Sequence, residues 1–415
     1  KVRIMEVGYQ QLYGKEAEVQ KARYTAIKAG FEKTFGKAEG AEWFSAPGRT
    51  EIGGNHTDHN HGHVLTAAVN LDIVGLARKT ENGVIRLKSA EYDKLDEVSL
   101  SDLSAREEAS GSQSLIRGIC AKCLELGYQV GGFDCYTMTR VLKGSGLSSS
   151  AAFEILVVTV INLLFNEGRI DSVTAAIIAQ YAENVYFGKP SGLLDQMASS
   201  VAGFTSIDFQ EPTKPVIRQV NFDFSSCGHA LCVVDTGGNH ADLTAEYAAI
   251  PKEMKEVAAY FGKEFLREVD EREFYGSLRE LRRAVGDRAI LRAMHFFDDD
   301  RLAVEEADAL EAGNFEAFKK MIHTSGQSSY QRLQNVFAVV APREQGISLA
   351  LAVSEFLLGA DGAYRVHGGG FAGTIQAFVP LEKLDEYQGT MEQVFGPGSC
   401  HVLFVRQFGG VKVVL

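Results

Sequence analysis

The chain has 415 residues, of which 45% are hydrophobic and 23% are charged, and its formal net charge is −12. This length predicts two or three domains. The acidic balance argues against a general nucleic-acid binder or a protein that coats anionic membranes, because both need a positive field over one face. No apolar run approaches the ~20 residues that cross a bilayer, and residues 1–20 lack the apolar block of a signal peptide. We therefore expect a cytoplasmic protein.

The six cysteines include one C-x-x-C pair, Cys120 and Cys123, inside a helix-like run. A structural zinc site needs a second pair of ligands at similar spacing, and the sequence offers none. Buried thiols in a reducing compartment are therefore the expected state of the cysteines.

The first half of the chain mixes predicted helices and strands, which we assign from helical and period-two spacing of apolar residues. In chain order these elements are a helix over Lys15–Phe35, strands over Trp43–Ala46, Val64–Val69, Ile73–Arg78 and Val84–Ser89, a helix over Ser114–Leu126, a strand over Phe133–Val141, and helices over Ala151–Phe165 and Val173–Phe187. Gly188-Lys189-Pro190 ends the last helix with residues that stop helices.

The pattern restarts near Cys227. A buried strand is predicted over Ala230–Asp235, and charged helices follow from Ala241 to about Asn335. The tail then alternates strand, strand, helix and strand over Tyr364–Val366, Phe371–Val379, Leu381–Val394 and His401–Gln407. Strands mixed with helices in both halves predict two α+β domains, residues 1–215 and 216–415.

Three segments carry residues suited to chemistry, and the first runs from Lys143 to Ala152. Its small residues let backbone N–H groups approach an anion, and the helix that follows points its positive end at the same place. Three serines at the first turn of this helix, Ser148, Ser149 and Ser150, add hydroxyl groups for phosphate oxygens or Mg²⁺. The spacing is not that of a Walker A loop, which ends in Gly-Lys-Ser/Thr. A serine N-cap on a buried helix is the alternative interpretation.

The second segment, Pro47–His63, holds four histidines within eight residues. A glycine-rich loop of this kind rarely holds metal ligands rigidly, and its amide, imidazole, carboxylate and guanidinium groups suit a polyhydroxylated ligand better than zinc. The third segment, Arg365–Gly373, places five small residues between two strand-like runs. This predicts a backbone that approaches a phosphate or another loop, with a bulged turn as the alternative.

In this order the three segments resemble the motifs of the GHMP kinases, and within that superfamily the galactokinases match best. The first galactokinase motif reads roughly Gly-Arg-x-Asn-hydrophobic-Ile-Gly-Glu-His-x-Asp-Tyr, and Gly48–His59 follows it without a gap. Gly188–Gln196 looks like the catalytic-aspartate segment of that family, and Ala245-Glu246-Tyr247 is similar to its Ser-Glu-Tyr. The resemblance runs from about Glu42 to Pro380.

The resemblance implies an α+β, two-domain GHMP kinase fold. Its N-terminal α/β domain would contain a mixed sheet, its C-terminal domain would be ferredoxin-like, and the active site would lie in the cleft between them. The implied reaction is ATP- and Mg²⁺-dependent phosphorylation of the anomeric hydroxyl of a monosaccharide, first of all D-galactose. Asp195 would take or orient the proton, and Arg49 would keep Asp195 ionised and steady the phosphoryl group. A monomer or weak homodimer is expected.

The other site residues carry over onto the positions that match the family motifs. Substrate contacts are expected from Asn55, His56, Asp58, His59, Gly192 and Tyr247. The nucleotide is expected to lie on Gly144, Ser145, Gly146, Leu147, Ser148, Ser149, Ser150 and Ala151. Mg²⁺ is expected on Ser150 and Glu183, a pair of hard oxygen ligands.

Four residues depart from the first motif of the family: Glu51 replaces asparagine, Gly53 an aliphatic residue, Asn55 glutamate and His59 tyrosine. The family's glutamate contacts the C6 hydroxyl of the sugar. Asparagine there removes a negative charge and adds two N–H donors. Galacturonate, which carries a carboxylate at C6, is therefore an alternative substrate, as is another hexose.

Further departures concern the nucleotide and the third motif. Gly111–Gly118 lacks the tryptophan that galactokinases often place near the base, so the choice between ATP and GTP stays open. In the third motif His367 replaces threonine and Ala372 replaces glycine, which is tolerable if backbone atoms do the binding.

Two other classes of protein are considered. A galactokinase-like sugar sensor without turnover would be expected if the serine-rich loop were damaged, but Ser148–Ala152, Arg49, Glu183 and Asp195 are all present. A GHMP kinase for mevalonate or homoserine is disfavoured by Tyr247 and His56-Thr57-Asp58, because an aliphatic acid needs no such array of hydroxyl-binding groups.

Overall fold

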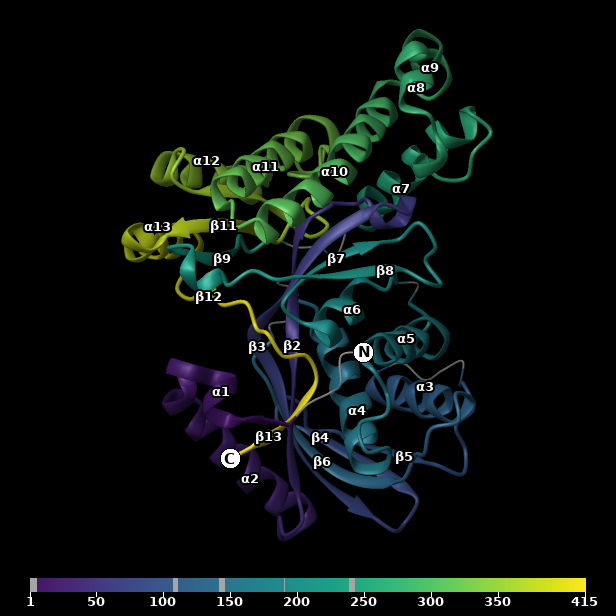
Figure 1. Cartoon of the computed structure of the whole chain (residues 1–415), viewed down its shortest axis with the longest axis vertical. Coiled ribbons are helices and arrows are strands. Elements are labelled where there is room, and N and C mark those ends of the chain that lie inside the picture. Colours follow the sequence, from purple (N-terminus) through teal and green to yellow (C-terminus); the bar gives the residue numbers. More distant parts are fainter. Residues whose placement is uncertain (1–5, 107–110, 142–145, 190, 239–242) are drawn as a thin grey trace.

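The computed structural model describes residues 6–106, 111–141, 146–189, 191–238 and 243–415. Within these ranges the fold is built on two sheets, one in each half of the molecule, with helices packed against both (Figure 1). In the same part of the chain, no helix is long and apolar enough to cross a membrane. All six cysteines are free, and all but Cys227 are buried, as expected.

The larger sheet has the strand order β1-β13-β2-β3-β6-β4-β5, and β7 joins it by pairing with β3 and β8. Pairs β1–β13 and β4–β6 are parallel and the other pairs antiparallel, so the prediction of a mixed sheet is confirmed. Its strands are β1 (Glu6–Gly8), β2 (Glu42–Gly53), β3 (His63–Thr80), β4 (Val84–Ser89), β5 (Leu95–Ser99), β6 (Gly132–Thr139), β7 (Phe204–Asp208), β8 (Val216–Val220) and β13 (Val411–Val414).

The smaller sheet is antiparallel and has the order β10-β11-β9-β12. Along the chain its elements run strand, helices, strand, strand, helix, strand, which is the ferredoxin-like pattern. The predicted α+β fold with a ferredoxin-like C-terminal part is therefore confirmed. The strands are β9 (His229–Asp235), β10 (Ala363–His367), β11 (Thr374–Pro380) and β12 (Cys400–Leu403).

Helices cover both sheets (Figure 1). In the first half they are α1 (Tyr9–Tyr13), α2 (Ala17–Phe35), α3 (Ser112–Glu125), α4 (Ser149–Phe165), α5 (Ser172–Tyr181) and α6 (Leu194–Val201). In the second half they are α7 (Thr244–Tyr260), α8 (Glu271–Gly276), α9 (Leu278–Ala284), α10 (Asp287–Glu311), α11 (Phe315–Ser328), α12 (Gly346–Leu358) and α13 (Leu384–Phe395). Helix α4 is apolar around most of its circumference and forms the centre of the first core, as such a sequence requires.

Two strands from beyond residue 215 pair within the larger sheet. Strand β8 pairs with β7, and β13 returns near the C-terminus to lie between β1 and β2. The predicted boundary at residue 215 does not match these pairings. The compositional restart near Cys227 marks the start of the smaller sheet, whereas the short strands β8 and β13 carry no compositional break. The division into two domains stays a prediction.

Strand β3 is one continuous strand of 18 residues, although the sequence predicted two strands separated at Asn70–Asp72. Asp72, which lies inside this strand, has a fully buried side chain. Its carboxylate lies 2.6 Å from Arg23 Nη1 and 3.2 Å from Arg406 Nη1, and it accepts a hydrogen bond from Ser45 Oγ at 2.5 Å. Asp72 thus joins α2, β2, β3 and the C-terminal segment beside Pro47, where the first motif begins.

The electrostatics of Asp72 follow from this enclosure. Burial acts to raise the pKa of Asp72, but Arg23 and Arg406 outweigh that effect and hold it below the usual value. The carboxylate is therefore the charged partner of two buried guanidinium groups. Removal of its charge leaves both cations buried without their shared counter-ion.

We expect Asp72→Asn to lower the free energy of unfolding by about 3–5 kcal/mol, because it leaves buried cations unpaired. Urea denaturation followed by circular dichroism measures this loss. The pKa of Asp72 is lowered on folding, so its contribution is present above the unfolded value of about 3.9 and disappears as the pH falls towards the folded value. Asp102→Asn, which removes an exposed ion pair with Arg106, is the control. Equal stability of Asp72→Asn and wild type near neutral pH would contradict this role.

Candidate active site

A cavity of about 280 Å³ lies where the first and third motifs meet the segment before α6. This volume lies at the lower end of the range for small-ligand pockets and suits a molecule of monosaccharide size. Its walls carry guanidinium, carboxylate, imidazole and hydroxyl groups. The lining residues are Arg49, Glu51, His56, Asp58, His59, Ser191, Gly192, Leu194, Asp195, Gly368 and Gly369.

Arg49 and Asp195 form the charged centre of this cavity. Arg49 Nη2 lies 2.7 Å and Nε 2.8 Å from Asp195 Oδ1, and Ser148 Oγ donates to Asp195 Oδ2 at 2.6 Å. Burial acts to raise the pKa of Asp195, but Arg49 and the hydrogen bond from Ser148 act in the opposite direction and hold it below its usual value. Asp195 also lies in the first turn of α6, where the helix dipole favours a negative charge. It is therefore ionised at neutral pH.

The serine-rich loop meets this pair at the start of α4. Ser148 has a φ of +56°, its hydroxyl makes no N-cap hydrogen bond, and the same hydroxyl donates to Asp195. The alternative of a simple serine N-cap is therefore not realised, and the first N–H groups of α4 are not capped by this side chain. Arg49 Nη1 also donates to the carbonyl of Gly146, and Arg49 N to that of Leu147 at 3.0 Å. Gly144 and Ser145 lie outside the described residues.

Glu183 lies in the π-helical turn Ala182–Phe187 that follows α5. Its Oε1 accepts from Lys189 Nζ at 3.0 Å and from Ser150 Oγ at 3.4 Å. Its Oε2 accepts from Ser191 Oγ at 2.7 Å and from Gln196 Nε2 at 2.8 Å. The structure thus brings together Ser150 and Glu183, the pair predicted to hold Mg²⁺.

Two of the four clustered histidines, His56 and His59, line the cavity and are linked to each other. Asn60 Nδ2 donates to His59 Nδ1 at 3.0 Å, so His59 Nε2 carries the proton and donates to His56 Nδ1 at 3.3 Å. His56 Nε2 then donates to the carbonyl of Gly369 at 3.0 Å. Burial lowers the pKa of His59, and it lowers that of His56 to about 3. Both rings are therefore neutral.

The other two histidines point elsewhere. His61 stacks on Phe265 with ring centroids 3.6 Å apart, and His63 lies between Asp208 and Asp300 at 3.2 and 3.1 Å. Among the described residues, no group of three or more His, Cys, Asp or Glu side chains is placed to hold a metal ion.

Asp58 and Gly192 lie next to each other in the cavity lining, since a Cβ atom on Gly192 would lie 3.1 Å from Asp58 Oδ2. Tyr247, predicted to contact the substrate, is not part of the lining. Its hydroxyl donates to the carbonyl of Gly370 at 2.8 Å, and its ring would be 2.7 Å from a Cβ atom on Gly369. In this structure Tyr247 supports the third motif from behind.

The third motif is confined by other segments of the protein. A Cβ atom on Gly370 would lie 2.0 Å from the carbonyl oxygen of Asn335. The imidazole of His367 forms hydrogen bonds of 2.9 Å with the hydroxyl groups of Thr50 and Thr374. Burial lowers the pKa of His367 to about 3. Small residues are needed here because neighbouring backbone and rings approach closely, which agrees with the predicted approach to another loop.

Asn55 is fully buried and lies outside the cavity lining. Its Nδ2 donates to Glu51 Oε1 at 2.8 Å and to the carbonyl of Gly368 at 2.7 Å, and its Oδ1 accepts from Asn335 Nδ2 at 2.9 Å. Both N–H groups that suggested a contact with the substrate are used inside the protein. The geometry therefore does not support Asn55 as a residue that touches the sugar.

Sequence reasoning missed Glu51 as a lining residue. Arg49 and Glu51 are two residues apart on β2, and alternate residues of a strand face the same side. Once Arg49 is placed in the site, this spacing predicts that Glu51 lies there too. The lining also includes Ser191, Leu194, Gly368 and Gly369, which flank motif residues.

Two family models match the chain: "Galactokinase galactose-binding signature" over residues 29–79 and "GHMP kinases N terminal domain" over residues 114–203. Among solved structures, galactokinase from Lactococcus lactis complexed with galactose superposes with a TM-score of 0.79 at 23% identity, over 94% of this chain and 100% of the other. A mevalonate kinase superposes with a TM-score of 0.63 at 14% identity, over 88% and 99% of the two chains. Both share the fold.

Curated relatives are similar over most of their length. A galactokinase from Clostridium tetani is 27% identical over 368 residues, which cover 87% of this chain and 90% of the relative. A galactokinase from Streptomyces coelicolor is 30% identical over 368 residues, which cover 88% of this chain and 91% of the relative. With these matches and the shared fold, the chain belongs to the galactokinase family of the GHMP kinases.

Proposed function

We propose that this protein transfers the γ-phosphoryl group of ATP to the anomeric hydroxyl of D-galactose and releases galactose 1-phosphate and ADP. The observation that carries the proposal is the Arg49–Asp195 ion pair at 2.7 Å, in a cavity of monosaccharide size beside the start of α4. The curated relatives named galactokinase and the solved relative complexed with galactose support the same substrate.

Asp195 acts on the anomeric hydroxyl. Because Arg49 and Ser148 keep it ionised, its carboxylate accepts the hydroxyl proton while the sugar oxygen forms a bond to the γ-phosphorus. The bond from that phosphorus to the bridging oxygen breaks, and ADP leaves with the electron pair. Arg49 steadies the transferring phosphoryl group, since charge stabilisation and positioning supply most of the rate in this chemistry.

The nucleotide lies with its phosphates at the start of α4. The first N–H groups of this 17-residue helix, together with the backbone of Gly146 and Leu147, form the kind of site that binds phosphate. Ser148 has a left-handed backbone, which is a local strain of the sort found at functional sites. Ser149, Ser150 and Ala151 follow in the first turn.

Ser150 and Glu183 would hold Mg²⁺. The two side chains offer hydroxyl and carboxylate oxygens that are 3.4 Å apart, and water and phosphate oxygens would supply the remaining ligands. The donor set fits the ion, with Lys189 as a second cation at 3.0 Å from the same carboxylate. When bound, Mg²⁺ would neutralise negative charge on the phosphates.

The galacturonate alternative loses its basis. That alternative required Asn55 to be a neutral contact for a C6 carboxylate. Both N–H groups of the Asn55 side chain instead donate to Glu51 and to the carbonyl of Gly368. Glu51, whose carboxylate lines the cavity together with those of Asp58 and Asp195, would repel a carboxylate on the sugar when ionised.

The function is tested by ADP release from ATP and Mg²⁺ in the presence of D-galactose. We expect Asp195→Asn to lower kcat by about 10²- to 10⁴-fold, because it removes the proton acceptor. Asp361→Asn, an exposed carboxylate outside the cavity, is the matched control and should retain full activity. Undiminished turnover in Asp195→Asn contradicts the assigned role. Galactose binding by calorimetry without any ADP release in the wild type would indicate a sugar sensor.

The role of Arg49 is tested by the pH dependence of kcat at saturating galactose. Arg49→Met removes the cation that lowers the pKa of Asp195, so the pKa of that carboxyl should rise and the acidic limb of kcat should move to higher pH. Ser148→Ala removes one hydrogen bond and should move the limb in the same direction by less. An acidic limb at the same pH in wild type and Arg49→Met would show that Arg49 does not control Asp195.

A further inference from the structure

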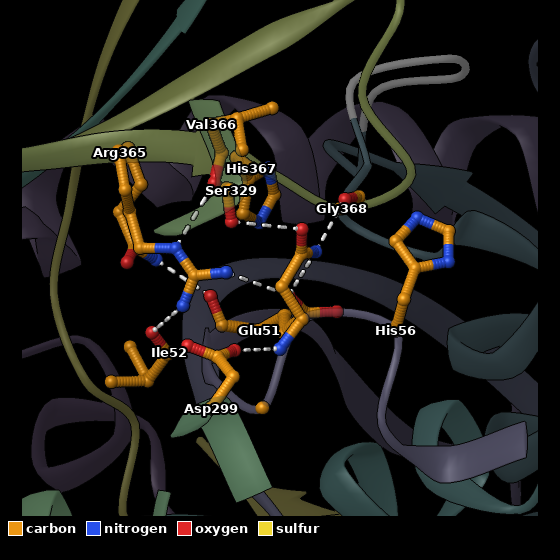
Figure 2. Close-up of polar contacts among 12 residues, drawn as sticks. Glu51, Ile52, His56, Asp299, Ser329, Arg365, Val366, His367 and Gly368 are labelled. Atoms are coloured by element: carbon orange, nitrogen blue, oxygen red, sulfur yellow. Dashed lines mark hydrogen bonds and ion pairs between the residues drawn. The ribbon is translucent and has the colours of Figure 1, made fainter. Parts of the chain in front are cut away.

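Within the described residues, only one of the two carboxylate oxygens of Glu51 accepts hydrogen bonds. Its Oε1 accepts from Asn55 Nδ2 at 2.8 Å and from Arg365 Nη2 at 3.3 Å (Figure 2). Within the described part of the chain, Oε2 has no hydrogen-bond partner. The side chain is 13% exposed, and that exposure is to the cavity that it lines. Oε2 is therefore an acceptor that is available to a ligand.

The position of Glu51 along β2 fixes which part of a ligand it can meet. Two residues of an extended strand span roughly 7 Å, so Glu51 follows Arg49 along the same wall at about the width of a sugar ring. Arg49 holds Asp195, which marks the place of the anomeric hydroxyl. Glu51 then faces the opposite part of the ring.

Gly53 and Asn55, which also depart from the first galactokinase motif, belong to the packing that supports Glu51. A Cβ atom on Gly53 would lie 1.7 Å from Glu306 Oε2, so glycine leaves the space that the Glu306 carboxyl of α10 occupies. Asn55 N donates to Asp299 Oδ2 at 2.6 Å, which ties the loop to the same helix. The three departures therefore form one packed arrangement in which Asn55 and Arg365 orient Glu51.

Both acidic and basic groups surround Glu51. Burial raises the pKa of Glu51 to about 7, while Arg365 and the hydrogen bond from Asn55 act in the opposite direction. The titratable and charged groups packed around it are Arg49 on β2, His56, Asp58 and His59 in the loop that follows, Asp195 on α6, His295, Asp299 and Glu306 on α10, and Arg365 on β10. Near neutral pH Glu51 is thus present both as carboxylate and as acid.

We propose that Glu51 is the specificity-determining residue of this enzyme: its free Oε2 hydrogen-bonds a sugar hydroxyl remote from the anomeric carbon, at C4 or C6, and its charge excludes sugars with a carboxylate there. This inference rests on the proposed function, because it takes the anomeric hydroxyl to lie at Asp195. Asn55 supports Glu51 and does not touch the sugar.

The test compares wild type, Glu51→Gln and Glu51→Asp, using D-galactose, its 4-deoxy and 6-deoxy analogues and D-galacturonate. We expect Glu51→Gln to raise KM for galactose about 10- to 100-fold, the range for loss of a hydrogen bond to a charged group, with kcat within about threefold. The preference of the wild type for galactose over one deoxy analogue should disappear, and galacturonate should become a better substrate. In wild type KM should change across neutral pH, and in Glu51→Gln this change should vanish.

Glu51→Asp keeps the charge, so it should weaken galactose binding but still exclude galacturonate. Circular dichroism melting of each variant separates a loss of specificity from a loss of fold, since a merely structural defect raises KM equally for galactose and both deoxy analogues. That equal rise, or an unchanged KM in Glu51→Gln, overturns the inference while galactose turnover by the wild type still stands. Absence of galactose turnover by the wild type contradicts the proposed function itself.

Discussion

The site depends on the contacts that the guanidinium group of Arg49 makes. It pairs with Asp195 at 2.7 Å and donates to the carbonyl of Gly146, so one side chain joins β2, the serine-rich loop and α6. These segments are far apart in the sequence, and they meet where α4 and α6 pack against β2 of the larger sheet. Arg49 can reach them because β2 continues through Pro47 beside the Asp72 cluster, which fixes β2 against β3.

One end of the cavity carries charged side chains, whereas burial disfavours the charged forms of several side chains in its wall. Arg49 keeps Asp195 ionised at one end, whereas burial leaves His56 and His59 neutral. Burial also raises the pKa of Glu51 to about 7. The neutral imidazoles can therefore bind an uncharged hexose through directed hydrogen bonds, while Asp195 carries a negative charge at the place where, in the proposed function, the proton is accepted. This separation suits a reaction in which the other substrate is itself highly anionic.

The sequence predicted the fold and much of the site because the motifs are local and consecutive. The resemblance to the galactokinase motifs implied that Arg49 pairs with Asp195 and Ser150 with Glu183, and the structure brings each pair together. A motif shows which position varies but not which way its side chain points. The orientation of Asn55 depends on Gly368, Asn335 and Asp299, which are hundreds of residues away. The short strands β8 and β13 were missed for a similar reason, since their pairing is set by the sheet that they join.

The most direct test of this account is a crystal structure of the protein with D-galactose and the β,γ-imido analogue of ATP. The account predicts the anomeric hydroxyl within about 2.6–3.2 Å of the Asp195 carboxylate, the phosphates at the start of α4, and Glu51 Oε2 on a hydroxyl across the ring. A sugar turned with its anomeric carbon away from Asp195, or bound outside the cavity, would contradict it.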